Sequence, residues 1–209
     1  MNILLFGATG LTGSRVLEEL LINGYQVTAV SREAASIKTT HTSLKKISGN
    51  VLDEDFVTRM LERQDAVVST ISEGVEIKQH TQSKGNGNII KAMEAQGVKR
   101  FVCMGAVGIL AAPEGGLLRE KAGYPSLYLP LSYEHSKVNE LLQSSKLYWT
   151  QVCPPMILPR PSDGKYLVKA NQLPSTVGQV NAGNIGAFIA KELRQPEFIP
   201  QRVGITNAG

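Results

Sequence analysis

The amino-terminal segment restricts the fold more than any other part of the chain, because an apolar run, a glycine turn and an amphipathic segment follow one another without a spacer. Residues 2–6 suit a buried parallel strand, and Gly7, Gly10 and Gly13 come directly after them. Apolar residues within 16–21 then recur at helical spacing. A pyrophosphate can approach a backbone that lacks side chains, and the free N–H groups of a helix start favour an anion. The pattern predicts a dinucleotide site; the alternative is a tight turn that binds nothing.

The rest of the chain alternates between apolar runs and helical patterns. Such alternation implies right-handed crossovers and a parallel sheet covered on both faces. The expected fold class is α/β, a Rossmann-type doubly wound parallel sheet with a small C-terminal substrate region, and we expect residues 1–209 to form one domain. The expected strands are 26–30, 44–48, 65–71, 100–104 and 149–153, and the expected helices are 54–63, 88–96, 132–145 and 185–193.

The composition excludes several classes of protein. With 42% hydrophobic residues, 209 residues are enough for the core of one domain. No stretch approaches the ~20 apolar residues of a membrane span. The short apolar start has no basic segment before it, as a signal peptide would have. We therefore expect a cytoplasmic protein without a membrane partner.

Charge and metal-ligating residues give no sign of a nucleic-acid or metal partner. The net charge is +4, but the basic residues are scattered along the chain. Cys103 and Cys153 lie in apolar segments, which favours buried thiols, and the three histidines lack ligand spacing. We expect no metal and no nucleic acid, a small-molecule substrate, and a monomer or homodimer.

Two stretches rich in glycine and proline interrupt the alternation, at about residues 105–131 and 154–181. Both follow late strands, and open α/β sheets place their ligands beyond the carboxyl ends of the strands. We expect these stretches to form the substrate walls. The alternative is that they are surface loops without a role.

The residues after the second expected strand bear on the choice of cofactor. A site specific for NAD(H) would place Asp or Glu there to bind the ribose hydroxyls, but this chain has Ser31 and Arg32. The guanidinium of Arg32 can bind a 2′-phosphate that a carboxylate would repel, and Arg15 could add to the same field. The sequence therefore favours NADP(H) over NAD(H); the alternative is that Arg32 is an ordinary exposed residue.

Three further segments resemble those of one family. Residues 49–53 read Gly-Asn-Val-Leu-Asp, residues 69–71 read Ser-Thr-Ile, and residues 147–157 end in Pro-Pro-Met-Ile. With the glycine turn, they resemble the atypical or extended branch of the short-chain dehydrogenase/reductase superfamily, which includes NmrA-like and biliverdin/flavin reductase-like proteins. The resemblance implies that 49–53 borders adenine, with the amide oxygen of Asn50 as acceptor, and that 69–71 and the end of 147–157 border the nicotinamide ribose and nicotinamide. The residues expected to bind the cofactor are Gly7, Thr9, Gly10, Leu11, Thr12, Gly13, Ser31, Arg32, Asn50, Val51, Ser69, Thr70, Ile71, Gly105, Lys137, Pro154, Pro155 and Met156.

Tyr133 and Lys137 match the Y-x-x-x-K pattern of the same superfamily. Positions i and i+4 share a helix face, so the resemblance implies that Lys137 activates Tyr133 and holds the ribose, while Tyr133 gives or takes the proton. The superfamily's substrate-orienting serine is missing, because Gly105 and Ala106 stand in that segment. A flavin or quinone acceptor would depend less on such a donor, since its protons can come from solvent.

These patterns together predict an NADPH-dependent reductase of the atypical short-chain type that passes hydride to a small carbonyl, quinone or flavin acceptor. One alternative is an NmrA-like protein that binds NADP(H) as a redox sensor without catalysis, which the missing serine would suit. A sugar-nucleotide epimerase or dehydratase is a further alternative within the same family.

Overall fold

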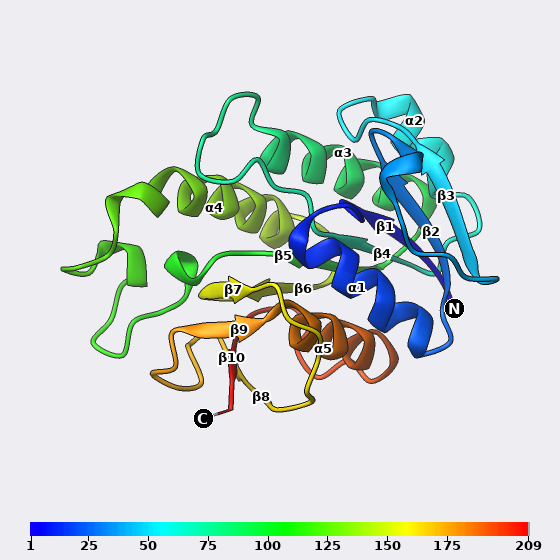
Figure 1. The fold of residues 1–209 in the computed structure, drawn as a ribbon. Helices are drawn as coiled ribbons and strands as arrows, with labels where there is room; N and C mark the ends of the chain where they lie inside the picture. The colour runs from blue at the N-terminus through cyan, green and yellow to red at the C-terminus, as the bar shows by residue number, and fades with distance from the viewer. Residues whose placement is uncertain (209) are drawn as a thin grey trace.

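Strands and helices alternate along the chain in the predicted order (Figure 1). The computed structural model describes residues 1–208. The elements are β1 (Asn2–Phe6), α1 (Leu11–Ile22), β2 (Gln26–Ser31), β3 (Leu44–Ser48), α2 (Glu54–Met60), β4 (Ala66–Ser69), α3 (Thr81–Gln96), β5 (Arg100–Met104), α4 (Leu129–Ser144), β6 (Tyr148–Cys153), β7 (Met156–Leu158), β8 (Tyr166–Ala170), β9 (Gln179–Asn181), α5 (Ala182–Arg194) and β10 (Gln201–Asn207).

Eight strands form one sheet in the order β3-β2-β1-β4-β5-β6-β10-β8. Neighbouring strands are parallel except at one edge, where β8 runs antiparallel to β10. The short strands β7 and β9 pair separately and in parallel. The chain moves outward from β1 to β3 and then crosses to β4 on the other side of β1, so the order reverses between β1 and β4. Ligands of doubly wound sheets bind at such a switch point.

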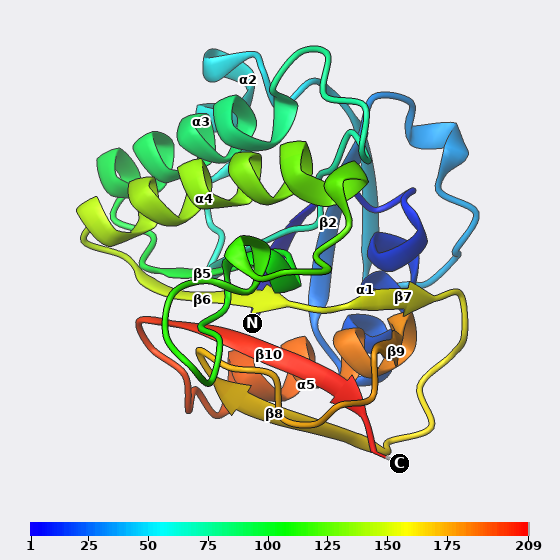
Figure 2. The ribbon, with the colours of Figure 1, turned by 90° about the vertical axis from the view of Figure 1, so that its left-hand side faces the viewer.

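Helices cover both faces of the sheet, which confirms the predicted fold class. The side chains of β1 alternate between the two cores: Ile3 and Leu5 pack with α1 and α5, whereas Leu4 and Phe6 pack with α2, α3 and α4. Figures 1 and 2 show α3 and α4 side by side on one face, with α5 on the other. The all-apolar run of 3–6 follows from this arrangement, because a strand buried on both faces has no solvent side.

Helix α3, which was expected from residue 88, begins at Thr81. Its first two turns are polar, so an apolar periodicity could not reveal them, yet Gln82 and Asn86 are buried there. A Cβ on Gly85 would lie 2.7 Å from a methyl group of Val51, so glycine permits close packing at this point. The early start of α3 brings polar side chains to the carboxyl edge of the sheet.

The stretch 154–181 is not the long loop that its prolines and glycines indicated. It contains β7, β8 and β9, and β8 extends the main sheet. These strands have only three to five residues, too few for a clear alternation in the sequence. Within residues 1–208, no helix combines the length and apolar character needed to cross a membrane.

Candidate functional site

A cleft of about 860 Å³ opens beyond the carboxyl ends of the strands, across the switch point between β1 and β4. It is lined by residues that follow β1, β2, β4, β5 and β6. Open α/β sheets bind their ligands at this place. The cleft joins segments that the sequence assigned to one ligand, and the predicted residues that line it are Gly7, Thr9, Gly10, Leu11, Thr12, Ser31, Arg32, Asn50, Val51, Thr70, Ile71, Gly105 and Pro154.

The three glycines after β1 have different steric roles. Gly7 has φ +85°, and a Cβ on it would lie 2.7 Å from Thr70 Oγ1. A Cβ on Gly13 would lie 2.0 Å from the carbonyl oxygen of Gly7, so α1 could not pack so closely against β1 with any other residue there. A Cβ on Gly10 would meet only that same oxygen, at 3.5 Å. Gly7 and Gly13 therefore shape the turn, while Gly10 leaves bare backbone in the cleft lining.

The start of α1 faces the cleft without a capping side chain. Gly10 is the N-cap residue, and the first turn carries no acidic residue. The first N–H groups of an α-helix have no partner within the helix, and those of Leu11, Thr12 and Gly13 belong to this class. Free N–H groups and the positive end of the helix dipole favour a phosphate. The residues of this turn thus fit the pyrophosphate of a dinucleotide in both space and charge.

Arg32 lines the cleft directly after β2, as the sequence predicted. The neighbouring acid, Glu33, is not part of the lining, and its carboxylate accepts a hydrogen bond from Ser36 Oγ at 3.1 Å. Asn50 also lines this end, and its Oδ1 accepts a hydrogen bond from the N–H of Leu52 at 3.0 Å. The Asn50 amide oxygen, which the family resemblance assigns to adenine, therefore already accepts one hydrogen bond within the protein.

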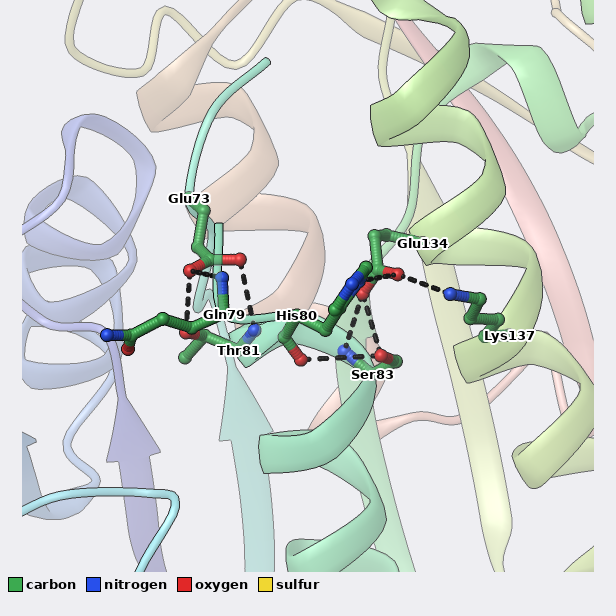
Figure 3. Close-up of polar contacts among 7 residues, drawn as sticks. All are labelled: Glu73, Gln79, His80, Thr81, Ser83, Glu134 and Lys137. Atoms are coloured by element: carbon green, nitrogen blue, oxygen red, sulfur yellow. Dashed lines mark hydrogen bonds and ion pairs between the residues drawn. The ribbon is translucent and has the colours of Figure 1, made fainter. Parts of the chain in front are cut away.

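The segment of residues 72–81, which connects β4 to α3, forms a wall of the cleft that the sequence did not predict. The carboxylate of Glu73 accepts hydrogen bonds from the N–H of Gln79 (3.1 Å), the N–H of Thr81 (3.1 Å) and the hydroxyl of Thr81 (2.9 Å), as Figure 3 shows. Burial raises the pKa of Glu73, but these hydrogen bonds lower it by more, so the net pKa lies below its ordinary value. One ionised side chain thus braces both ends of the wall.

A second carboxylate, that of Glu134 on α4, holds the start of α3 (Figure 3). It is buried and lies 2.7 Å from His80 Nδ1, 2.7 Å from Ser83 Oγ and 2.8 Å from Lys137 Nζ. Burial raises the pKa of Glu134, but the hydrogen bonds from Lys137, Ser83 and His80 outweigh it and lower the pKa to about 2. His80, the N-cap residue of α3, has a left-handed backbone conformation with φ +57°. Glu134 therefore joins α4 to the end of the 72–81 segment.

Tyr133 and Lys137, the expected catalytic pair, are not among the residues that line the cleft. Lys137 is drawn to the carboxylate just described, while Tyr133 is 54% exposed with the Arg119 guanidinium 4.8 Å from its ring centre. Helix α4 instead turns Leu131 and His135 to the cleft. Two residues along an α-helix correspond to a rotation of about 200°. The spacing thus gave the pair a common face, but that face points away from the cleft.

The end of the cleft beyond β5 and β6, here called the β5–β6 end, is apolar apart from one imidazole. His135 is buried, its Nε2 lies 2.9 Å from the Gln82 amide nitrogen, and its Nδ1 is shielded from solvent. Burial lowers the pKa of His135 to about 4, so the ring is neutral at pH 7. The residues that define this end are Met104, Gly105, Ala106, Leu131, His135, Pro154 and Ile157.

The remaining predicted site residues do not form part of the lining. Gly13 lies behind the turn, Ser69 is buried in β4, and Met156 is 59% exposed in β7. The two expected substrate walls contribute little to the lining: both ends of 105–131 and only the beginning of 154–181 line the cleft. The rest of each stretch folds into separate turns and strands. Leu131 and His135 line the cleft but were not predicted. Their spacing of four residues, which places them on one helix face, is the one sequence signal that could have indicated them. The predicted residues outside the lining are Gly13, Ser69, Tyr133, Lys137, Pro155 and Met156.

The family of the chain follows from a comparison with known proteins. The family model for NAD(P)H-binding proteins matches residues 7–196, and the chain belongs to that family. Among curated relatives, the uncharacterised protein YwnB of Bacillus subtilis is 25% identical over 158 residues, which cover 74% of this chain and 71% of YwnB.

Solved structures with the same fold include proteins described as reductases and epimerases. A protein of Bacteroides thetaiotaomicron described as an epimerase is 26% identical, with a TM-score of 0.86 over 100% of this chain and 97% of that one. A Streptococcus pneumoniae protein described as an NADH-flavin reductase is 21% identical, with a TM-score of 0.83 over 99% of both chains. A short-chain dehydrogenase/reductase of Veillonella parvula in complex with NADP is 16% identical, with a TM-score of 0.82 over 100% of this chain and 95% of that one. The family model confirms the predicted family of NAD(P)-binding proteins, and these structures share the Rossmann-type fold of this chain.

Proposed function

We propose that this chain is an NADP(H)-dependent oxidoreductase that passes hydride to a small carbonyl, quinone or flavin acceptor. The observation that carries the proposal is Arg32, which lines the cleft directly after β2 where an NAD(H) site would have a carboxylate. The nearest acid, Glu33, lies outside the lining. The short-chain relative of Veillonella parvula, which was solved with NADP, lends support at the level of the fold.

Each part of the cleft has a distinct task in this proposal. The N–H groups at the start of α1 would hold the pyrophosphate, and the guanidinium of Arg32 would bind the 2′-phosphate through charge-assisted hydrogen bonds. The β5–β6 end would hold the nicotinamide and keep water from it. When bound, the nicotinamide supplies the hydride.

Binding measurements with NADPH and NADH test the choice of cofactor. Hydrogen bonds to a charged group contribute about 1.5–3 kcal/mol, so Arg32→Ala should weaken NADPH binding by about 10- to 100-fold and leave NADH binding unchanged. The exposed Arg59→Ala on α2 is the matched control. Isothermal titration calorimetry measures both affinities. Equal affinities in the wild-type protein, or no loss in Arg32→Ala, would refute the preference for NADP(H).

A second candidate function is an NADP(H) sensor without catalysis. It is favoured by the absence of a hydroxyl at Gly105 and Ala106 and by the position of Tyr133 and Lys137 outside the cleft. A sensor should bind NADPH but should not oxidise it, whichever acceptor is added. Oxidation of NADPH, followed by its absorbance with flavins, quinones and aldehydes, separates the two functions.

A further inference from the structure

We propose that Lys78 is a second cationic contact for the cofactor: its ammonium group binds the pyrophosphate, in competition with the neighbouring carboxylate of Glu76. This inference rests on the proposed function, since it concerns the cofactor of the same cleft. It gives a task to the 72–81 segment, the wall of the cleft that the sequence did not predict.

The lining of the cleft has little positive charge for a ligand that carries three phosphate groups. Among residues 1–208, its cations are Arg32 and Lys78 and its carboxylates are those of Glu73 and Glu76, so the formal charges cancel. His135 is neutral at pH 7, because burial lowers its pKa to about 4. The proposed function places Arg32 at the 2′-phosphate. Lys78 is therefore the cation of the lining that is left for the pyrophosphate.

The 72–81 segment presents its charged side chains to the cleft. Glu76 and Lys78 are exposed and belong to the lining. Val75 and Ile77, which stand next to them in the sequence, are partly buried and lie outside the lining. The two apolar side chains thus turn elsewhere, and the two charged ones face the space that a ligand would fill.

The Glu73 carboxylate restricts where Lys78 can lie. The segment leaves the sheet beside the glycine turn, because β4 neighbours β1 and the hydroxyl of Thr70 donates to the carbonyl oxygen of Gly7 at 3.2 Å. Figure 3 shows Glu73 accepting a hydrogen bond from the N–H of Gln79, at 3.1 Å. The chain therefore folds back, and the residue that follows Lys78 is tied to one that lies just beyond β4.

Of the two carboxylates in this wall, Glu76 is the one that competes for the ammonium group. Glu73 already accepts three hydrogen bonds, from the N–H groups of Gln79 and Thr81 and from the Thr81 hydroxyl. Glu76 Oε2 lies 3.4 Å from Lys78 Nζ, and the two side chains are 79% and 76% exposed. Ion pairs as exposed as this one are weak, because water screens them. A phosphate offers more acceptor oxygens than one carboxylate, so Lys78 can exchange Glu76 for the pyrophosphate.

Isothermal titration calorimetry with three ligands tests the assignment to the pyrophosphate. NADPH, NADH and ADP-ribose all contain this group, but only NADPH has the 2′-phosphate, and ADP-ribose lacks nicotinamide. Lys78→Gln should weaken the binding of all three by about fivefold, because one exposed charge contact is lost. Lys78→Arg keeps the charge and should stay within about twofold of wild type. The matched control is Lys84→Gln, which removes an exposed lysine of α3 outside the cleft.

Glu76→Gln should act in the opposite direction. It removes the competitor of Lys78 and one negative charge of the lining, so all three ligands should bind about two- to fivefold more tightly. In the Lys78→Gln background the gain should be smaller, since the competition is gone. Both single effects should shrink as the salt concentration rises from about 0.02 M to about 0.5 M, because salt screens exposed charges. Urea unfolding should give the wild-type midpoint for both variants, since both side chains are exposed.

The outcomes separate this inference from the proposed function. Unchanged binding of all three ligands by Lys78→Gln, or weaker binding by Glu76→Gln, overturns the inference while the preference for NADP(H) survives. A loss confined to NADPH also overturns it, because Lys78 would then contact the 2′-phosphate, and so does a loss for both dinucleotides without one for ADP-ribose. Equal wild-type affinities for NADPH and NADH refute the proposed preference alone. A wild-type protein that binds none of the three ligands overturns both proposals.

Discussion

The glycine turn of residues 7–13 and the 72–81 segment both line one cleft but are held in different ways. The turn is fixed by sterics, because the backbone of Gly7 lies where a side chain on Gly13 would have to go. The 72–81 segment is fixed by two ionised side chains, Glu73 from within it and Glu134 from α4. The first wall therefore depends mainly on the absence of side chains, whereas the second depends on a few hydrogen bonds that a single substitution can remove.

Because of this difference, substitutions in the two walls should have different effects on stability. Damage to the glycine turn is a packing error in the core between β1 and α1, so it should affect the whole fold. Damage to the contacts of the 72–81 segment removes hydrogen bonds that lie outside the two apolar cores, so it should loosen that wall while the sheet stays intact. The three substitutions below probe this contrast, from the largest expected effect to the smallest.

Gly13→Ala should give the largest loss of stability. Its methyl group would overlap the carbonyl oxygen of Gly7, and such overpacking costs about 3 kcal/mol. Gly10→Ala is the matched control, because φ −71° and ψ 166° accept alanine and its Cβ would meet only ordinary contact. Urea unfolding should thus separate the two. NADPH titration should show at least tenfold weaker binding for Gly10→Ala, because its methyl group would enter the proposed phosphate site. Equal unfolding midpoints for the two variants would contradict the steric account.

Glu134→Gln should lower the free energy of unfolding by about 2 kcal/mol at pH 7, because it leaves His80 and Lys137 without their anion. Folding lowers the pKa of this carboxyl from 4.5 to about 2, so its contribution is complete above about pH 4.5 and is lost as the pH falls toward 2. The difference between variant and wild type should shrink over that range in urea unfolding. Glu140→Gln, on the exposed side of the same helix, should change stability by less than about 0.5 kcal/mol. A difference that stays constant down to pH 2 would refute the role of the charge.

Glu73→Gln should have the smallest effect on global stability, below about 1 kcal/mol, because the side chain is only partly buried. Its local effect should be clear, since the N–H groups of Gln79 and Thr81 lose a charged acceptor. Hydrogen exchange should become faster at those two amides while amides of the central sheet keep their protection. The control Glu76→Gln changes an exposed carboxylate in the same segment. Unchanged exchange at Gln79 and Thr81 would show that Glu73 does not brace this wall.

The sequence revealed the parts of the molecule whose causes are local. The run of residues 3–6 and the glycines after it report burial and steric need at their own positions, so β1, the turn and the start of α1 could be predicted as structural elements. Arg32 was found for the same reason, because its distance from the turn is set by one strand–helix–strand unit. For these elements the neighbouring residues contain the information that the fold uses.

Other parts of the site depend on contacts between distant residues, and no local pattern reports them. The spacing of Tyr133 and Lys137 gives a common helix face but not the rotation of α4 about its axis. That rotation is set by packing and by the contacts of Glu134 with His80 and Ser83. The buried polar side chains Gln82 and Asn86 looked like exposed residues, because their surroundings come from other elements. The 72–81 segment has no periodicity, and its shape follows from side-chain hydrogen bonds alone.

The two outermost strands of the sheet, β3 and β8, bear on how copies of this chain meet at high concentration. Among residues 1–208, each has a neighbouring strand on one side only, and the free side of an edge strand can template further strands. Lys45 and Lys46 lie on β3, and Lys169 lies on β8. Joining two molecules at these margins would crowd ammonium groups together, so the distribution of lysine protects this chain against fibril-like stacking during expression and storage.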